Sequence, residues 1–187
     1  MQAGDNGSAV DGRRAALKAL AAAGLALAGG GLGAAAETKS GTASGTADSG
    51  MLRRRIPSSG ELIAAVGLGT YQSFDVADSA DPALEQVLAR FVVLGGQVVD
   101  SSPMYGRSES VVGDLSAKLG LRDRLFLATK VWTSGRADGI RQMETSLTRL
   151  RTRQIDLMQV HNLLDWRLQL PTLREWKQQG RIRYLGV

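Results

Sequence analysis

The chain places an acid and a tyrosine close together where a short apolar run gives way to a loop. Asp100 closes the run GGQVVD, and Tyr105 follows it in the loop SSPMYGRSE. Asp, Ser, Pro and Gly are ordinary loop residues, so turn chemistry alone is one explanation. The other is a proton-transfer site, which needs partners elsewhere in the chain. Two further groups follow apolar runs in the same way, Lys130 after RLFLAT and His161 after IDLMQV.

Together the four side chains could reduce a carbonyl group. A phenol is a weak acid near neutral pH, and a close cation such as Lys130 makes Tyr105 a better proton donor. Asp100 can hold the ammonium by a charge-assisted hydrogen bond, and a neutral His161 can donate to the oxygen of a substrate carbonyl. Hydride arriving at the carbonyl carbon would create an alkoxide, which Tyr105 protonates. Since no side chain donates hydride, this chemistry requires a nicotinamide cofactor and needs no metal.

Each of these residues also has a structural explanation. Lys130 could be a solvated strand end, and Tyr105 could be a loop ring packed on the rim of the fold. His161 is the only histidine in the chain, and a single histidine at a strand end is more often structural than catalytic. Four such groups at the ends of neighbouring strands make a shared chemical role the better explanation.

The elements that must position these residues alternate between strands and helices. The expected strands are VGLGTY, QVVD, RLFLATK, IDLMQVHN and IRYLGV. Helices are expected to begin at the cap-and-proline pair Asp81–Pro82 and at Ser108, to span about 137–150, and to precede Gly180. Strands that alternate with helices imply βαβ units and a parallel sheet.

Two architectures fit a parallel sheet of this kind, a doubly wound sheet and a (β/α)8 barrel. The segment GLGTYQ lacks the third glycine of a dinucleotide-binding turn, because Gln72 stands there, and the chain has no Walker lysine loop. In a barrel, reactive side chains lie at the carboxyl ends of successive strands. Asp100, Lys130 and His161 are expected at such ends, so the sequence predicts an α/β barrel.

The chain resembles the aldo-keto reductase family. The motifs GLGTY, SSPMYGRSE with the Asp100 before it, LFLATKVW, IDLMQVHN and GRIRYLGV follow that family's order and spacing from about Arg53 to Val187. The resemblance implies a (β/α)8 TIM barrel whose floor is closed by an N-terminal β-hairpin, which RRRIP and ELIAAV would form. The sequence departs from the family pattern at Ser102, where the family usually has Ala.

The resemblance also implies the roles of individual residues. Asp100, Tyr105, Lys130 and His161 would be the catalytic tetrad, with Tyr105 as proton donor, Lys130 as the cation beside it and His161 as the group that orients the substrate. The family binds a nicotinamide cofactor, NADPH by default, and NADH stays open for this chain. The implied cofactor-binding residues are Gly69, Thr70, Asp100 and Asn162.

The length departs from that of a full barrel. A complete barrel takes about 250 residues, and the expected folded part, residues 51–187, supplies only about five strands, so the barrel is expected to be truncated after the fifth. Two hypotheses stay open. The chain is the N-terminal part of an NAD(P)H-dependent reductase of an aldehyde or ketone, or it is a catalytically inactive half-barrel that acts as a binding or assembly module. Open strand edges would favour self-association in either case.

The first 50 residues have a different composition. Residues 1–36 combine Arg13 and Arg14 with an Ala- and Gly-rich apolar run that ends in three alanines. This pattern resembles a twin-arginine export signal and predicts the export machinery as a partner, with delivery to a bacterial periplasm. An uncleaved membrane tether is the alternative. Residues 37–50 are rich in Gly, Ser and Thr and predict a flexible linker, so the folded domain is expected over 51–187.

Composition narrows the classes of partner. The net charge is +5, but much of the excess lies in the export signal and in the run Arg53–Arg55. The other basic residues are interspersed with acids, so we expect no nucleic-acid partner. The chain has no cysteine, which excludes disulfides and cysteine-ligated metals. The expected partner is a small-molecule carbonyl substrate.

Overall fold

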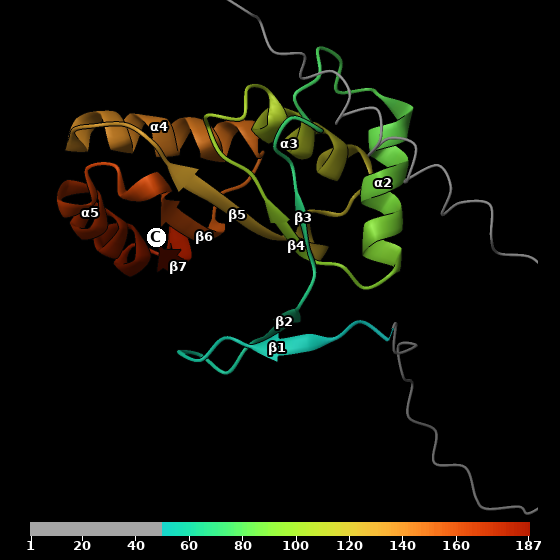
Figure 1. Ribbon diagram of the computed structural model, residues 1–187, viewed down its shortest axis with the longest axis horizontal. Helices are drawn as coiled ribbons and strands as arrows, with labels where there is room; N and C mark the ends of the chain where they lie inside the picture. Colours follow the sequence, from blue (N-terminus) through green and yellow to red (C-terminus); the bar gives the residue numbers. More distant parts are fainter. Residues whose placement is uncertain (1–49) are drawn as a thin grey trace, which may run out of the picture. The chain divides into compact units, whose positions relative to one another are not determined.

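Five strands lie parallel in one sheet and follow each other in chain order. A computed structural model describes residues 50–187 of the chain, and the expected export signal and nearly all of the linker lie outside these residues. Each strand pairs with the next one along the chain (Figure 1). The strands are β3 (Gly67–Gly69), β4 (Val98–Asp100), β5 (Phe126–Val131), β6 (Ile155–Val160) and β7 (Ile182–Gly186). A doubly wound sheet reverses its strand order partway, so the unbroken order is that of the predicted barrel.

One helix connects each pair of neighbouring strands. These helices are α2 (Pro82–Val93), α3 (Ser108–Lys118), α4 (Arg136–Arg149) and α5 (Trp166–Gln178). The start of α2 follows its sequence signal, because the Asp81 carboxylate accepts a hydrogen bond of 2.8 Å from the N–H of Ala83 and Pro82 occupies the first turn. All four helices therefore lie where the sequence predicted them, with bounds that differ by a residue or two.

The hydrophobic core forms between the sheet and these helices. Its fully buried side chains come from both layers, and they include Leu88, Val99, Leu115, Leu127, Met143, Ile155, Met158 and Leu173. In β5 the outward residues Leu127 and Val131 enter this core, while Lys130 points to the other face, as the alternation of a strand requires. Packing on one face thus fixes which side chains are left for the interior of the barrel.

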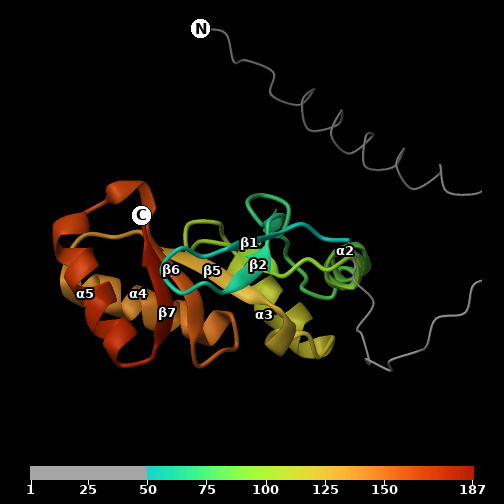
Figure 2. The ribbon, with the colours of Figure 1, turned by 90° about the horizontal axis from the view of Figure 1, so that it is seen from below.

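An antiparallel hairpin precedes the sheet, as predicted. It consists of β1 (Arg53–Arg55) and β2 (Leu62–Ala64), with Arg54 opposite Ile63. The turn between them passes through Gly60 at φ +75°, a left-handed conformation that favours glycine. Figure 2 shows the hairpin crossing in front of the strands when the domain is viewed from below. Arg53 of β1 contacts Gln97 just before β4, and Glu61 before β2 contacts Arg183 near the start of β7, so the hairpin lies at the amino-terminal ends of the strands.

Arg183 of β7 fastens the hairpin to the sheet. Its guanidinium forms ion pairs with Glu61 of the hairpin and with Asp156 of β6, the latter at 2.7 Å. The hydroxyl of Tyr184 also donates to Glu61 Oε2 over 2.5 Å. The hydrogen bonds from Arg183 and then from Tyr184 hold the pKa of Glu61 below its ordinary value of 4.5. The hairpin is thus held by a carboxylate that must be ionised.

The Glu61→Gln variant should reveal this contact in the pH dependence of stability. A carboxyl with a lowered pKa in the folded state stabilises it above the ordinary pKa and loses that effect as the pH falls through the folded value. We expect a loss of about 1 kcal/mol at neutral pH for these partly exposed groups and a smaller loss in acid. Urea unfolding of both chains at neutral pH and near pH 3 would measure it. Equal losses at the two pH values would contradict the assignment.

Candidate active site

The structure brings the four predicted residues to one edge of the sheet. Asp100 is the last residue of β4, Lys130 is the second-last residue of β5, and His161 directly follows β6. Parallel strands in consecutive order end at the same edge, and the register places Asp100 opposite Ala128, two residues before Lys130. Tyr105 lies in the loop between β4 and α3. This edge is the carboxyl-terminal one, where barrels carry their reactive side chains.

Lys130 is tied to β4 by two hydrogen bonds. Its Nζ donates to Asp100 Oδ2 and to the backbone oxygen of Ser101, each over 2.7 Å. Only 11% of its side chain is exposed, and an ammonium removed from water needs such partners. The same nitrogen lies 5.0 Å from the centre of the Tyr105 ring, within the range of a cation–π contact. The positive charge is therefore held beside the tyrosine.

The loop that carries Tyr105 is fixed at both ends. The N–H of Tyr105 donates to the oxygen of Ser102 over 3.0 Å, and Gly106 follows at φ +57°. A Cβ at Gly106 would lie 2.2 Å from the carboxylate of Asp75, which accepts from the N–H of Arg107 over 2.9 Å. The turn therefore requires glycine for its conformation and for space. It aims the chain from β4 into α3 with the tyrosine ring turned toward Lys130.

His161 faces Tyr105 across the site, because Tyr105 follows β4 and His161 follows β6, two strands further along the sheet. The two ring centres are 5.9 Å apart and the ring planes stand at 87°. Burial, followed by the positive charge of Lys130, lowers the pKa of His161 below 6.5, and the charge of Asp100 opposes this in part. The imidazole is therefore neutral near pH 7. Its Nδ1 lies 3.0 Å from the hydroxyl oxygen of Ser102.

The predicted cofactor-binding residues lie around the same strand ends. Gly69 ends β3 opposite Asp100, and no atom lies within 4 Å of the place where its Cβ would be. Asn162 directly follows His161 and is exposed. Thr70 is fully buried, and its hydroxyl contacts the oxygen of Asp100 and the hydroxyl of Ser101, each over 3.0 Å. Gly69 and Asn162 are thus open to a ligand, whereas the Thr70 side chain fastens β3 to the loop after β4.

Three further groups belong to the site although the sequence did not mark them as reactive groups at strand ends. Gln159 Nε2 donates to Asp100 Oδ1 over 3.4 Å. Gln159 stands two residues before His161, and because side chains two apart on a strand share a face, this spacing could have predicted that it points into the site. The ring of Tyr71 packs on Tyr105 with 4.9 Å between centres. The third group is the backbone oxygen of Ser101, for which no sequence signal exists, since every residue carries that atom.

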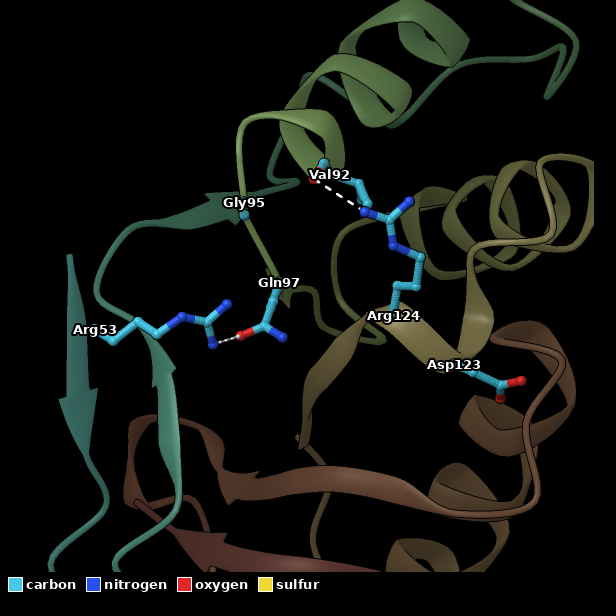
Figure 3. Close-up of a pocket in the computed structure, with 7 residues that line it drawn as sticks. Arg53, Val92, Gly95, Gln97, Asp123 and Arg124 are labelled. Carbon is cyan, nitrogen blue, oxygen red and sulfur yellow. Dashed lines mark hydrogen bonds between the residues drawn. The ribbon is translucent and has the colours of Figure 1, made fainter. Parts of the chain in front are cut away.

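A pocket of about 250 Å³ lies at the other end of the sheet (Figure 3). Arg53 of the hairpin donates to Gln97 over 2.9 Å, and Arg124 donates to the oxygen of Val92 over 3.4 Å. Gln97 precedes β4, and Asp123 and Arg124 precede β5, so the pocket lies at the amino-terminal ends of the strands. Each of these two guanidinium groups thus makes a hydrogen bond to a protein acceptor, which fits a seam beneath the hairpin.

Two other kinds of site are not found in the described part of the chain. Residues 50–187 contain no group of three or more His, Asp or Glu side chains placed to hold a metal ion. Within the same residues, no helix combines the length and the apolar character that crossing a bilayer requires.

Comparisons with known proteins identify the family and the fold. The sequence profile of the Aldo/keto reductase family matches residues 65–187. The chain is 33% identical over 144 residues to methylglyoxal reductase YeaE of Escherichia coli K12, which covers 73% of this chain and 50% of the relative. It is 31% identical over 136 residues to methylglyoxal reductase DkgA of Yersinia pestis, which covers 68% of this chain and 46% of the relative. An aldo-keto reductase from Klebsiella pneumoniae in complex with NADPH superimposes with a TM-score of 0.61 at 29% identity, over 73% of this chain and 50% of that one.

Fold and site together define an α/β barrel protein with an Asp–Lys–Tyr–His cluster at the carboxyl ends of its strands. With the profile match over residues 65–187, the chain belongs to the aldo-keto reductase family. It spans about half the length of the two relatives named above, 50% and 46%.

The titration of His161 should report the two opposite charges beside it. We expect Lys130→Met to raise the pKa of His161, because a repelling positive charge is removed, and Asp100→Asn to lower it further. A pH titration by NMR reads the pKa directly, since the chain has one histidine. Lys118→Met, which removes a cation on α3 that pairs with Glu85, is the matched control and should leave the pKa unchanged. Shifts of the same sign in the first two variants would refute the charge assignment.

Proposed function

We propose that the site reduces an aldehyde or ketone to an alcohol with hydride from NAD(P)H, and that Tyr105 is the proton donor. The observation that carries this proposal is the placement of Lys130, which is bound to Asp100 at 2.7 Å and lies 5.0 Å from the centre of the Tyr105 ring. A fixed cation beside a phenol stabilises the negative charge that forms on the phenol oxygen as its proton is transferred. The ion pair alone would fit a structural role, whereas its position against Tyr105 and His161 fits catalysis.

Each residue has a distinct task in this reaction. A neutral His161 donates from a ring nitrogen to the carbonyl oxygen and turns it toward Tyr105. Tyr105 passes its hydroxyl proton to that oxygen as negative charge develops there. Lys130 stabilises the phenolate that is left, and Asp100 holds Lys130 in place. The tilted ring of Tyr71 packs against the tyrosine and limits its rotation.

A nicotinamide cofactor fits the residues at the strand ends. The open space beside Gly69 lets a flat ligand approach the backbone, and exposed Asn162 offers an amide next to His161. With Asp100 and the backbone of Thr70 these residues would hold the nicotinamide end, and the bound cofactor supplies the hydride. NADPH is the proposed form, since the Klebsiella pneumoniae relative is known in complex with it, and NADH is the alternative. The proposed substrate is a small carbonyl compound, and methylglyoxal is the first to test, after the names of two relatives.

A second function is that of a catalytically inactive half-barrel that acts as a binding or assembly module. The observation that favours it lies in the sheet, where β3 and β7 each pair with only one strand of the five in the described part of the chain. A strand with an unpaired side is a template for another strand, including one from a second copy of the chain.

The Tyr105→Phe variant separates the two functions. We expect the unaltered chain to bind NADPH and to oxidise it when methylglyoxal is added. The variant should bind NADPH equally well and lose at least about 100-fold in turnover, because general acid catalysis typically contributes that much. Fluorescence titration and NADPH absorbance give the two readouts. Binding without turnover in the unaltered chain would contradict the reductase, and self-association without NADPH binding would favour the assembly module.

We further propose that residues 1–36 direct export of the domain at 51–187 to a periplasm, with residues 37–50 as a linker. Twin-arginine export carries folded proteins, which suits an enzyme that takes up its cofactor before it leaves the cytoplasm. The pair Arg13–Arg14, followed by an Ala-rich apolar run, supports this proposal. A signal that stays uncleaved would leave the domain tethered to the membrane instead.

Replacement of Arg13 and Arg14 by Lys should abolish export while the charge stays the same. The expected result is a shift of the chain from the periplasmic to the cytoplasmic fraction of expressing bacteria. The control is the same double replacement at Arg53 and Arg54, which lie in the hairpin and outside the proposed signal. Unchanged delivery of the Arg13, Arg14 variant to the periplasm would rule out the twin-arginine route.

A further inference from the structure

Ser102 is a buried hydroxyl, and among the residues that the structure describes its one side-chain partner is His161. Its Oγ lies 3.0 Å from His161 Nδ1, and the residue is 0% exposed. The two residues stand on different strand ends, since Ser102 follows β4 and His161 follows β6. This contact therefore crosses the site, and the proposed reaction gives it no task.

The direction of the hydrogen bond follows from the partners of each atom. A serine hydroxyl has one proton to donate and two lone pairs. The N–H of Met104 approaches one lone pair of Ser102 Oγ at 3.4 Å. Within residues 50–187, His161 Nδ1 is the one acceptor within hydrogen-bond distance of the hydroxyl proton. If Nδ1 carried a proton, the buried hydroxyl proton would lack an acceptor, which is unfavourable. Ser102 therefore donates, and Nδ1 accepts.

We propose that Ser102 is a positioning residue that holds His161 in the tautomer with its proton on Nε2. A neutral imidazole carries one proton, so a nitrogen that accepts from Ser102 leaves the N–H at the other end of the ring. The Nε2–H group can then donate a hydrogen bond to the carbonyl oxygen of a substrate. The use of the tautomer in reduction rests on the proposed function, whereas the tautomer itself does not.

The surroundings of His161 favour the neutral form of its ring near neutral pH. Only this neutral form has two tautomers between which Ser102 can select. Lys130 faces it from β5, Asp100 from β4 and Tyr105 from the loop before α3. Burial and the positive charge of Lys130 outweigh Asp100 and lower the pKa of the ring. Within the described residues, Nδ1 is the ring nitrogen with a hydrogen-bond partner, so Nε2 is left for a ligand.

The test is ¹⁵N NMR of the full chain with labelled histidine. Because His161 is the only histidine, every imidazole nitrogen signal belongs to it, and the two tautomers differ in which nitrogen carries the proton. We expect the proton on Nε2 in the unaltered chain near neutral pH. In Ser102→Ala the ratio of the Nε2–H to the Nδ1–H tautomer should fall by roughly 2- to 10-fold, the effect of one net hydrogen bond.

Two further variants make the result specific. Ser102→Thr keeps a hydroxyl at this position and should restore the ratio. Ser101→Ala removes the hydroxyl of the neighbouring residue, which is equally buried and contacts Thr70 instead of His161, and it should leave the ratio unchanged. A proton on Nδ1 in the unaltered chain, or an unchanged ratio in Ser102→Ala, would overturn the proposal.

A kinetic readout distinguishes this proposal from the proposed function. If the chain reduces methylglyoxal, Ser102→Ala should lower kcat/KM in proportion to the lost Nε2–H population, and Ser102→Thr should recover it. A chain without turnover would overturn the proposed function, while the tautomer ratio would still decide the role of Ser102. Full kcat/KM in a Ser102→Ala chain with a changed tautomer ratio would show that the reaction does not use this N–H.

Discussion

The ion pair between Lys130 and Asp100 is the contact on which the arrangement of the site depends. An ammonium with 11% of its side chain exposed is stable only if its charge is matched and its protons are accepted. Asp100 matches the charge, and the oxygen of Ser101 takes a second proton. Because both acceptors belong to the end of β4, the lysine of β5 is anchored to its neighbour strand. Tyr105 and His161 therefore lie beside a positive charge whose position is fixed.

The two ends of the parallel sheet carry different tasks. At the amino-terminal ends, Arg183 joins the hairpin to β7 and β6 through Glu61 and Asp156. At the carboxyl-terminal ends, the groups capable of chemistry come from β4, β5, β6 and the loop after β4. This separation is the general property of barrels with parallel strands. A change in the hairpin contacts is therefore expected to act on stability, and a change at the opposite edge on the proposed reaction.

Membership of the aldo-keto reductase family and the length of the match bear on different questions. The cluster of Asp100, Tyr105, Lys130 and His161 comes entirely from the segment between the last residue of β4 and the residue after β6, so all of it lies within the residues that match the family. The two named relatives are each about twice as long as the part of them that aligns with this chain. The groups proposed for proton transfer and part of the edge proposed for cofactor binding can therefore be examined in this chain directly, and reduction of a carbonyl by it is likewise a proposal.

The sequence alone determined the order of elements and the residues at their ends. Alternating apolar runs place Asp100, Lys130 and His161 at strand ends, and Asp81 and Pro82 mark the start of α2, because these signals are local. Only the tertiary structure decided which way the side chains turn. It showed that Thr70 faces inward, that Ser102 contacts His161, and that Glu61 meets Arg183 across 122 positions. Such contacts depend on strand register and on packing between distant segments, and a local pattern of residues carries no information on either.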